Sequence, residues 1–106
     1  MKESEIQSQI MDMLKKHPRV VWSMVTTTGK AQIAGYWVTL GFEGLSDILG
    51  QVETATGSTT LAIEVKRPGE QPTKAQHLFL DKVKMAGGIS GWCDSLKGAM
   101  DILEAV

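Results

Sequence analysis

Cysteine, long apolar runs and an excess of either charge are scarce or missing in this 106-residue chain. A single cysteine, Cys93, excludes an internal disulfide and any zinc site built from several cysteines. No apolar stretch approaches the ~20 residues that cross a bilayer. The first five residues are polar and acidic, and they lack the apolar centre of a signal peptide. We therefore expect a cytoplasmic protein.

The net charge of −1 gives the chain no global signature of a nucleic-acid binder. Basic residues nevertheless cluster at two places in the sequence. These clusters are Lys15, Lys16, His17 and Arg19, and then Lys66, Arg67 and Lys74. The length is enough for one modest core, so we expect a single domain over residues 1–106.

Residues 61–66, Leu-Ala-Ile-Glu-Val-Lys, alternate as a β-strand does. Their three larger apolar side chains point to one face, and Glu64 and Lys66 point to the other. Asp47 lies in a second short apolar run, residues 45–49, that also predicts a strand. Two acids and a lysine on adjacent strands can hold a divalent metal ion against a phosphodiester. Taken alone, the Glu64–Lys66 pair favours a solvated charge pair on an open sheet face.

The predicted fold class is α/β, with a small mixed central sheet flanked by helices and a core order α-β-β-β-α-β-α. The expected helices cover residues 3–16, 73–86 and a segment after Ser95, and the expected strands cover 19–28, 47–52, 60–66 and 89–93. Residues 29–30 are expected to form a turn, and residues 53–60 a hairpin turn.

Residues 31–40 are rich in aromatic and β-branched side chains, and the sequence leaves their role open. They form either a short strand or a loop with exposed aromatics. A strand here would be a packed hairpin arm or a dimer surface, whereas a loop would face DNA.

Glu3 begins the first predicted helix, three residues before Ile6 and seven before Ile10, so it extends the apolar stripe. An acid in the first turn also favours the helix dipole, which is the alternative explanation for Glu3. Glu5 lies about 200° around the helix from Glu3 and should face solvent. Gln76 falls in the first turn of the second helix, where its amide can reach a water or a phosphate oxygen.

Carboxylates from several elements suit magnesium, which prefers oxygen ligands and retains several waters, so two or three carboxylates suffice. A bound metal lowers the pKa of a water and stabilises charge on phosphate oxygens. Lys66 can orient that water or stabilise the developing negative charge. The pattern therefore predicts phosphodiester hydrolysis.

This ordered set resembles the PD-(D/E)XK nuclease superfamily, with Ser46-Asp47 in place of Pro-Asp and Glu64-Val65-Lys66 as E-X-K. Within that superfamily, the chain is similar to the virus-type replication-repair nuclease (VRR-NUC) domain. The residues that carry this similarity are 3–7, 44–47, 63–66 and Gln76. Ser46 replaces a proline that has no chemical role, and residues 31–40 make a longer spacer than expected.

The resemblance implies catalytic roles for Glu3, Asp47, Glu64, Lys66 and Gln76. The implied ligands of Mg²⁺ or Mn²⁺ are Asp47, Glu64 and the backbone carbonyl of Val65, with Lys66 as the catalytic lysine. Glu5 is the alternative helix glutamate.

The implied activity is a metal-dependent, structure-selective DNA endonuclease of repair or recombination. The leading form is a homodimer that cuts four-way (Holliday) junctions in the cytoplasm of a bacterium or a phage-infected host cell. Arg67, Lys74 and Lys30 are the expected DNA contacts, and neither a membrane nor an organic cofactor is expected. Flaps, nicked duplex or mismatches stay open as substrates, as does a non-catalytic DNA-binding module.

Overall fold

The computed structural model describes residues 1–105, and Val106, the last residue of the expected domain, lies outside the described part. The described elements, in chain order, are α1 (Glu3–Lys16), β1 (Val20–Val25), β2 (Gly29–Ile33), β3 (Tyr36–Leu40), β4 (Ile48–Thr54), β5 (Gly57–Val65), α2 (Lys74–Met85), β6 (Ile89–Cys93) and α3 (Leu96–Glu104). With β2 and β3 set apart, the order is α-β-β-β-α-β-α. None of the helices in residues 1–105 is long and apolar enough to cross a membrane.

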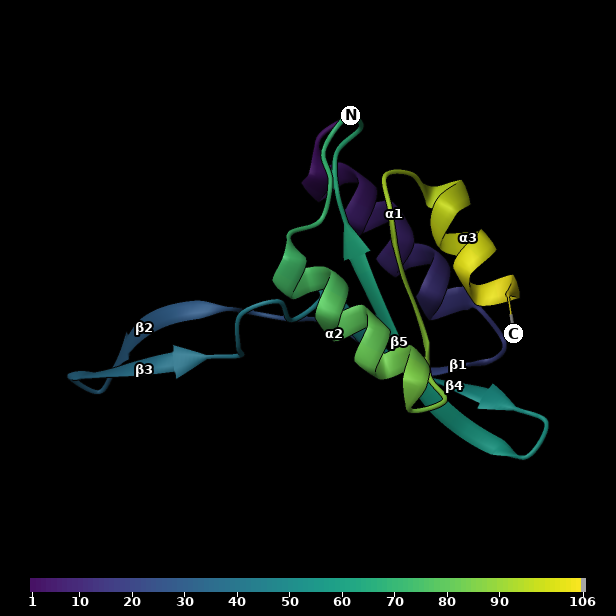
Figure 1. Cartoon of the computed structure of the whole chain (residues 1–106), viewed down its shortest axis with the longest axis horizontal. Coiled ribbons are helices and arrows are strands. Elements are labelled where there is room, and N and C mark those ends of the chain that lie inside the picture. Colours follow the sequence, from purple (N-terminus) through teal and green to yellow (C-terminus); the bar gives the residue numbers. More distant parts are fainter. Residues whose placement is uncertain (106) are drawn as a thin grey trace.

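A mixed four-stranded sheet in the order β1-β4-β5-β6 forms the centre of the molecule. The pairs β1–β4 and β4–β5 are antiparallel, and β6 joins β5 in parallel through the α2 crossover. Helices α1 and α3 pack together against one face, and α2 covers the other face over β5 and β6 (Figure 1). The predicted α/β fold class, a small mixed sheet flanked by helices, is confirmed.

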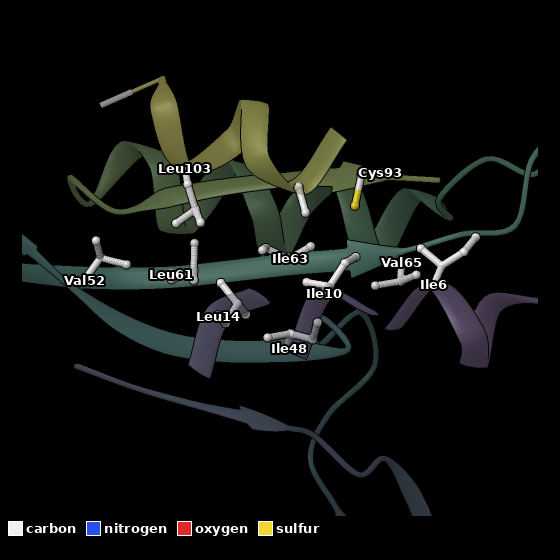
Figure 2. Close-up of a cluster of buried hydrophobic side chains, with 11 residues drawn as sticks. Ile6, Ile10, Leu14, Ile48, Val52, Leu61, Ile63, Val65, Cys93 and Leu103 are labelled. Atoms are coloured by element: carbon white, nitrogen blue, oxygen red, sulfur yellow. The ribbon is translucent and has the colours of Figure 1, made fainter. Parts of the chain in front are cut away.

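The hydrophobic core lies between the sheet and the α1–α3 layer (Figure 2). In β5, Leu61, Ile63 and Val65 enter this core, as the alternation of residues 61–66 predicts. Glu64 points to the opposite face, below α2, and is only 2% exposed. The Glu64 side of β5 is therefore not an open, solvated sheet face.

The α2 helix is turned by about one position from the orientation that its sequence predicts. The spacing along the helix predicts that Ala75, Leu78, Phe79, Lys82 and Val83 face inward. Leu78 is instead 52% exposed and Lys82 is exposed, whereas Leu80 is buried. In this orientation Gln76 faces inward and hydrogen-bonds to Glu64. Residues three and four positions further along the helix follow Gln76 to the inner side.

β2 and β3 form a separate hairpin that extends away from the central sheet (Figure 1). Its two turn residues, Ala34 and Gly35, have positive φ angles of 51° and 83°, which is typical of a type I′ turn. The expected turn at residues 29–30 is wrong, because these residues begin β2. Of the alternatives for residues 31–40, a strand is observed, but the hairpin is not a packed arm, because Ile33, Tyr36 and Trp37 are 55%, 75% and 72% exposed.

The connection between β4 and β5 is also shorter than expected. The strands pair as far as Thr54 and Gly57, so the turn consists of two residues instead of residues 53–60. The small polar side chains that indicate a turn instead lie in the ends of both strands.

Candidate metal and catalytic site

The other four side chains predicted to be catalytic come from segments that approach Glu64, near the C-terminal end of β5. The Glu64 Oε1 atom accepts a hydrogen bond from Nε2 of Gln76 at 3.0 Å. The charges of Asp47, Lys66 and Glu3 each act on the pKa of Glu64. The four side chains come from α1, the segment before β4, the end of β5 and the start of α2.

The Asp47 side chain is held where the backbone pairing between β4 and β5 has ended. The β4–β5 pairing ends at Ile48 and Ile63, so Val65 has no backbone partner on the β4 side. Its N–H instead donates to Oδ2 of Asp47 at 2.8 Å. The Asp47 carboxylate thus takes the place of a backbone carbonyl, which holds it beside Glu64.

Two hydroxyl groups fix the backbone that carries Asp47. Ser46 is 1% exposed, and its Oγ donates to the carbonyl of Ile48 at 3.0 Å. Thr26 donates its backbone N–H to the carbonyl of Asp47 at 2.8 Å and its hydroxyl to the carbonyl of Ser46. A proline at position 46 has no hydroxyl to donate. The role of Thr26 was not predictable from the sequence, because its partner lies twenty residues away and leaves no local signal.

Gln76 is held at both ends of its side-chain amide. With Thr73 it forms a capping box, in which its N–H donates to Thr73 Oγ1 at 3.2 Å and its Oε1 accepts from Thr73 N–H at 2.8 Å. Because Oε1 is engaged, the amide nitrogen must face Glu64. Gln76 therefore positions Glu64, while its capping box with Thr73 fixes the start of α2.

The glycine loop before Asp47 packs against the first turn of α2. Gly44 has a φ angle of 90°, and a Cβ atom there would lie 2.4 Å from the carbonyl oxygen of Ala75. The rings of Phe42 and Phe79 meet edge to face at 5.3 Å. Glycines in a loop predict that backbone approaches a ligand or another segment closely. At Gly44 the close neighbour is the helix that carries Gln76.

Burial is the largest of the effects that raise the pKa of Glu64 from 4.5 to about 8. The negative charges of Asp47 and Glu3 act in the same direction, and Lys66 opposes them. Oε2 of Glu64 is buried and has no hydrogen-bond partner among the described residues. Two ionised carboxylates repel each other and cannot share a hydrogen bond. This buried acid therefore needs either a proton or a cation.

Lys66 is close to the acids but forms no ion pair with them. Within residues 1–105 the ion pairs are Arg67–Glu70 and Lys97–Asp101. The backbone N–H of Lys66 donates to the carbonyl of Cys93 at 2.9 Å, which continues the contact of β5 with β6. Its ammonium group remains available to a phosphate group.

The donor set fits a hard divalent cation. Asp47 and Glu64 supply neighbouring carboxylates, and one buried oxygen of Glu64 has no partner. Among residues 1–105, no group of three or more His, Cys, Asp or Glu side chains is placed to hold a metal ion. An ion held here would complete its shell with backbone and water oxygens, as Mg²⁺ does.

The three basic residues expected to contact DNA are all exposed, but they have different surroundings. Arg67 is paired with Glu70, and Lys74 is the first residue of α2. Lys30 lines a surface hollow of ≈ 430 Å³ that Gln76 also lines. The hollow thus connects the base of the β2–β3 hairpin with the start of α2.

No protein-family model matches the chain, and no curated protein matches it. The similarity to the VRR-NUC domain therefore depends on the residues of the chain itself.

Proposed function

We propose that this protein is a metal-dependent DNA endonuclease that hydrolyses phosphodiester bonds in branched DNA, with Mg²⁺ or Mn²⁺ as its cofactor. The supporting observation is Glu64, a buried carboxyl with a pKa of about 8 and an oxygen without a partner. Such an acid is costly to the fold. Strongly shifted pKa values of this kind concentrate at functional sites. A purely structural role would give the fold no stabilisation that offsets this free-energy cost.

Asp47, Glu64 and the backbone carbonyl of Val65 would hold the metal. When bound, the metal lowers the pKa of a water and stabilises charge on the phosphate oxygens. The hydrogen bonds from Val65 to Asp47 and from Gln76 to Glu64 orient the two carboxylates in advance. Such outer bonds strengthen metal binding by fixing the ligands.

Lys66 and Glu3 would act on the substrate and its water. The unpaired ammonium of Lys66 supplies positive charge to a phosphate oxygen on which negative charge develops. Glu3 is half-buried at the start of α1, and its carboxylate can accept a hydrogen bond from a water in the site. Glu5 is exposed, so we assign the role of the helix glutamate to Glu3.

The proposal includes a homodimer that cuts four-way junctions. One chain of this size carries one site, whereas a two-fold dimer presents two sites to two strands and gives paired nicks. Because the substrate is DNA, we place the activity in the cytoplasm of a bacterium or of a phage-infected cell.

The proposal is tested with the purified protein, a labelled four-way junction and a duplex of the same sequence, with and without Mg²⁺ or Mn²⁺. We expect junction cleavage only with metal, and a loss of at least about a hundredfold in rate for Lys66→Ala and Asp47→Asn, as for other residues that stabilise transition-state charge. Asp81→Asn and Lys97→Ala are matched controls, because both residues are exposed and lie outside the site.

Metal-independent cutting, or full activity in both site variants, would refute the mechanism. Equal cutting of duplex, or a preference for flaps, nicks or mismatches, would refute the junction assignment but leave the chemistry intact. Junction binding that is unaffected by Lys66→Ala, without cleavage under any condition, would favour a non-catalytic DNA-binding module.

A further inference from the structure

The β2–β3 hairpin, residues 29–40 (the arm), has one apolar side and one more polar side. Residues that pair across the strands point to the same side of a hairpin. The apolar side consists of Ala31, Ile33, Tyr36, Val38 and Leu40. The other side consists of Lys30, Gln32, Trp37 and Thr39.

The apolar side of the arm lacks a partner within the described part of the chain. Tyr36 is 75% exposed and Ile33 is 55% exposed. β2 and β3 contact each other extensively but make no extended contact with the other elements of residues 1–105. An isolated two-stranded hairpin is marginally stable in water, so this arm gains from a surface that covers it.

The charge of the arm favours a protein surface over DNA. Lys30 is the only charged residue in positions 29–40. Arms that bind the DNA backbone neutralise several phosphates with lysine and arginine. A nearly uncharged arm with apolar side chains instead fits an apolar protein surface.

The chain itself carries such a surface on the central sheet. Met24 pairs with Leu49, and Trp22 pairs with Gln51 on the neighbouring strand. These four residues (the open face) belong to β1 and β4. Because α2 packs over β5 and β6 alone, Met24 stays 49% exposed and Trp22 stays 46% exposed.

The strand register shows that the open face continues the sheet surface on which α2 packs. Leu49 pairs with Ala62, which in turn pairs with Ser90. The hydroxyl of Ser90 donates to the carbonyl of Leu80 in α2. One half of this sheet surface is therefore covered by α2, and the other half, the open face, has no helix over it.

We infer that two copies of this chain dimerise by exchanging arms, so that the apolar side of each arm packs on the open face of the other copy. The two surfaces lie on the same chain, so a two-fold axis makes the contact twice and leaves neither surface free. The inference rests on the proposed homodimer but does not require the nuclease chemistry.

The most exposed apolar side chains supply about half of the area that this interface needs. Tyr36, Ile33, Trp22 and Met24 present roughly 400 Å² per copy, if each is given the area of about 150–250 Å² that an aromatic side chain buries. Each partner in a standard interface contributes about 800 Å². The arm backbone and the smaller apolar residues beside these four must supply the remainder.

The test is sedimentation equilibrium of the full chain over a range of concentrations. We expect the wild type to be a dimer, and Tyr36→Lys in the arm or Met24→Glu in the open face to raise the dimer dissociation constant at least roughly tenfold, as for the loss of an interface anchor. Met85→Ser is the control, since Met85 is 89% exposed but lies outside both surfaces. Circular dichroism checks that each variant is folded.

An equal mixture of the two variants gives the sharper result. In a mixed pair, one wild-type arm meets one wild-type open face, and the altered residues form a Lys–Glu pair in the second contact. We expect the mixture to dimerise at concentrations at which each variant alone is monomeric. A monomeric mixture would show that the arm and the open face do not meet across copies, and it would overturn the inference.

Hydrogen exchange of the wild type tests the same contact without a substitution. Amides of β1, β2 and β3 should be protected at high protein concentration and lose protection on dilution. Concentration-independent exchange would overturn the inference, as would a monomeric wild type whose Tyr36→Lys variant binds junctions more weakly, because the arm would then contact DNA. A dimeric protein without cleavage activity would leave this inference intact and refute the proposed function alone.

Discussion

Glu64 and Asp47 are neighbouring acids that differ in their hydrogen bonds. Asp47 accepts the backbone N–H of Val65. Glu64 receives one bond from Gln76 and leaves its second oxygen without a partner. Because Glu64 is buried beside a second acid, its ionised form is the less stable one, and the pKa of Glu64 is about 8. The pair is thus prepared to exchange a proton for a cation.

Replacing Asp47 with asparagine separates the two causes of this pKa. Asp47→Asn removes the negative charge and keeps an oxygen that can accept the Val65 N–H. We expect the pKa of Glu64 to fall below 8 but to stay above 4.5, because burial is the largest cause and remains. An NMR titration of the Glu64 side-chain carboxyl in metal-free protein measures this change.

Asp81→Asn is the control for that titration, because Asp81 is an exposed acid of α2. It should leave the pKa of Glu64 unchanged. If Asp47→Asn also leaves that pKa at about 8, then Asp47 does not lie beside Glu64 and the candidate site is wrong.

At the scale of elements, the sequence predicts the parts whose pattern is local. The apolar stripe of residues 3–16 and the Thr73 cap predict α1 and the start of α2 correctly. The sequence left open whether residues 31–40 form a hairpin, because the turn begins with Ala34, where asparagine or aspartate would have marked a type I′ turn. Alanine at a positive φ angle gives no such signal and costs roughly 1 kcal/mol or more.

The candidate site was predictable in its residues but not in its connections. Alternation in residues 61–66 places Glu64 opposite the core, and Glu3 continues a helical stripe. Nothing local shows that Gln76 bonds to Glu64, because that bond joins residues twelve positions apart. Long-range hydrogen bonds of this kind depend on how the elements pack, which a single sequence does not reveal.

The contact between the glycine loop and α2 yields a prediction at the scale of elements. Gly44→Ala adds strain at a positive φ angle and a Cβ atom 2.4 Å from the carbonyl oxygen of Ala75. Gly69→Ala adds the same kind of strain at a φ angle of 93°, but its Cβ meets nothing within 4 Å. We expect a loss of about 1–2 kcal/mol for Gly69→Ala from strain alone, and about 1–3 kcal/mol more for Gly44→Ala from the clash.

Chemical denaturation of the two variants measures this difference. Because the clash displaces the turn that carries Gln76, Gly44→Ala should also weaken metal binding, whereas Gly69→Ala should not. Equal stability losses in the two variants would show that the loop does not press on α2.

At the scale of the whole molecule, the buried carboxyl of Glu64 makes the stability of the metal-free protein depend on pH. Between pH 4.5 and 8, Glu64 keeps its proton in the folded state and loses it in the unfolded state. The folded state therefore binds more protons than the unfolded state, and the free energy of unfolding falls as pH rises through this window. The pKa difference corresponds to a loss of at most about 5 kcal/mol by pH 8.

Glu64→Gln should remove this contribution, because glutamine does not titrate and keeps an oxygen that can accept the bond from Gln76. We expect the wild type to be less stable than Glu64→Gln at pH 8 in EDTA, and the difference to shrink as pH falls to 4.5. Mg²⁺ should recover stability in the wild type at pH 8 and have little effect on Glu64→Gln, because a ligand that binds the folded state alone stabilises it. Chemical denaturation across this pH range, with EDTA or Mg²⁺, measures both effects.

A wild type that gains stability relative to Glu64→Gln as pH rises in EDTA would contradict this prediction. It would mean that a cationic group of the protein itself, not a proton, neutralises Glu64. The acid would then have no need of a metal.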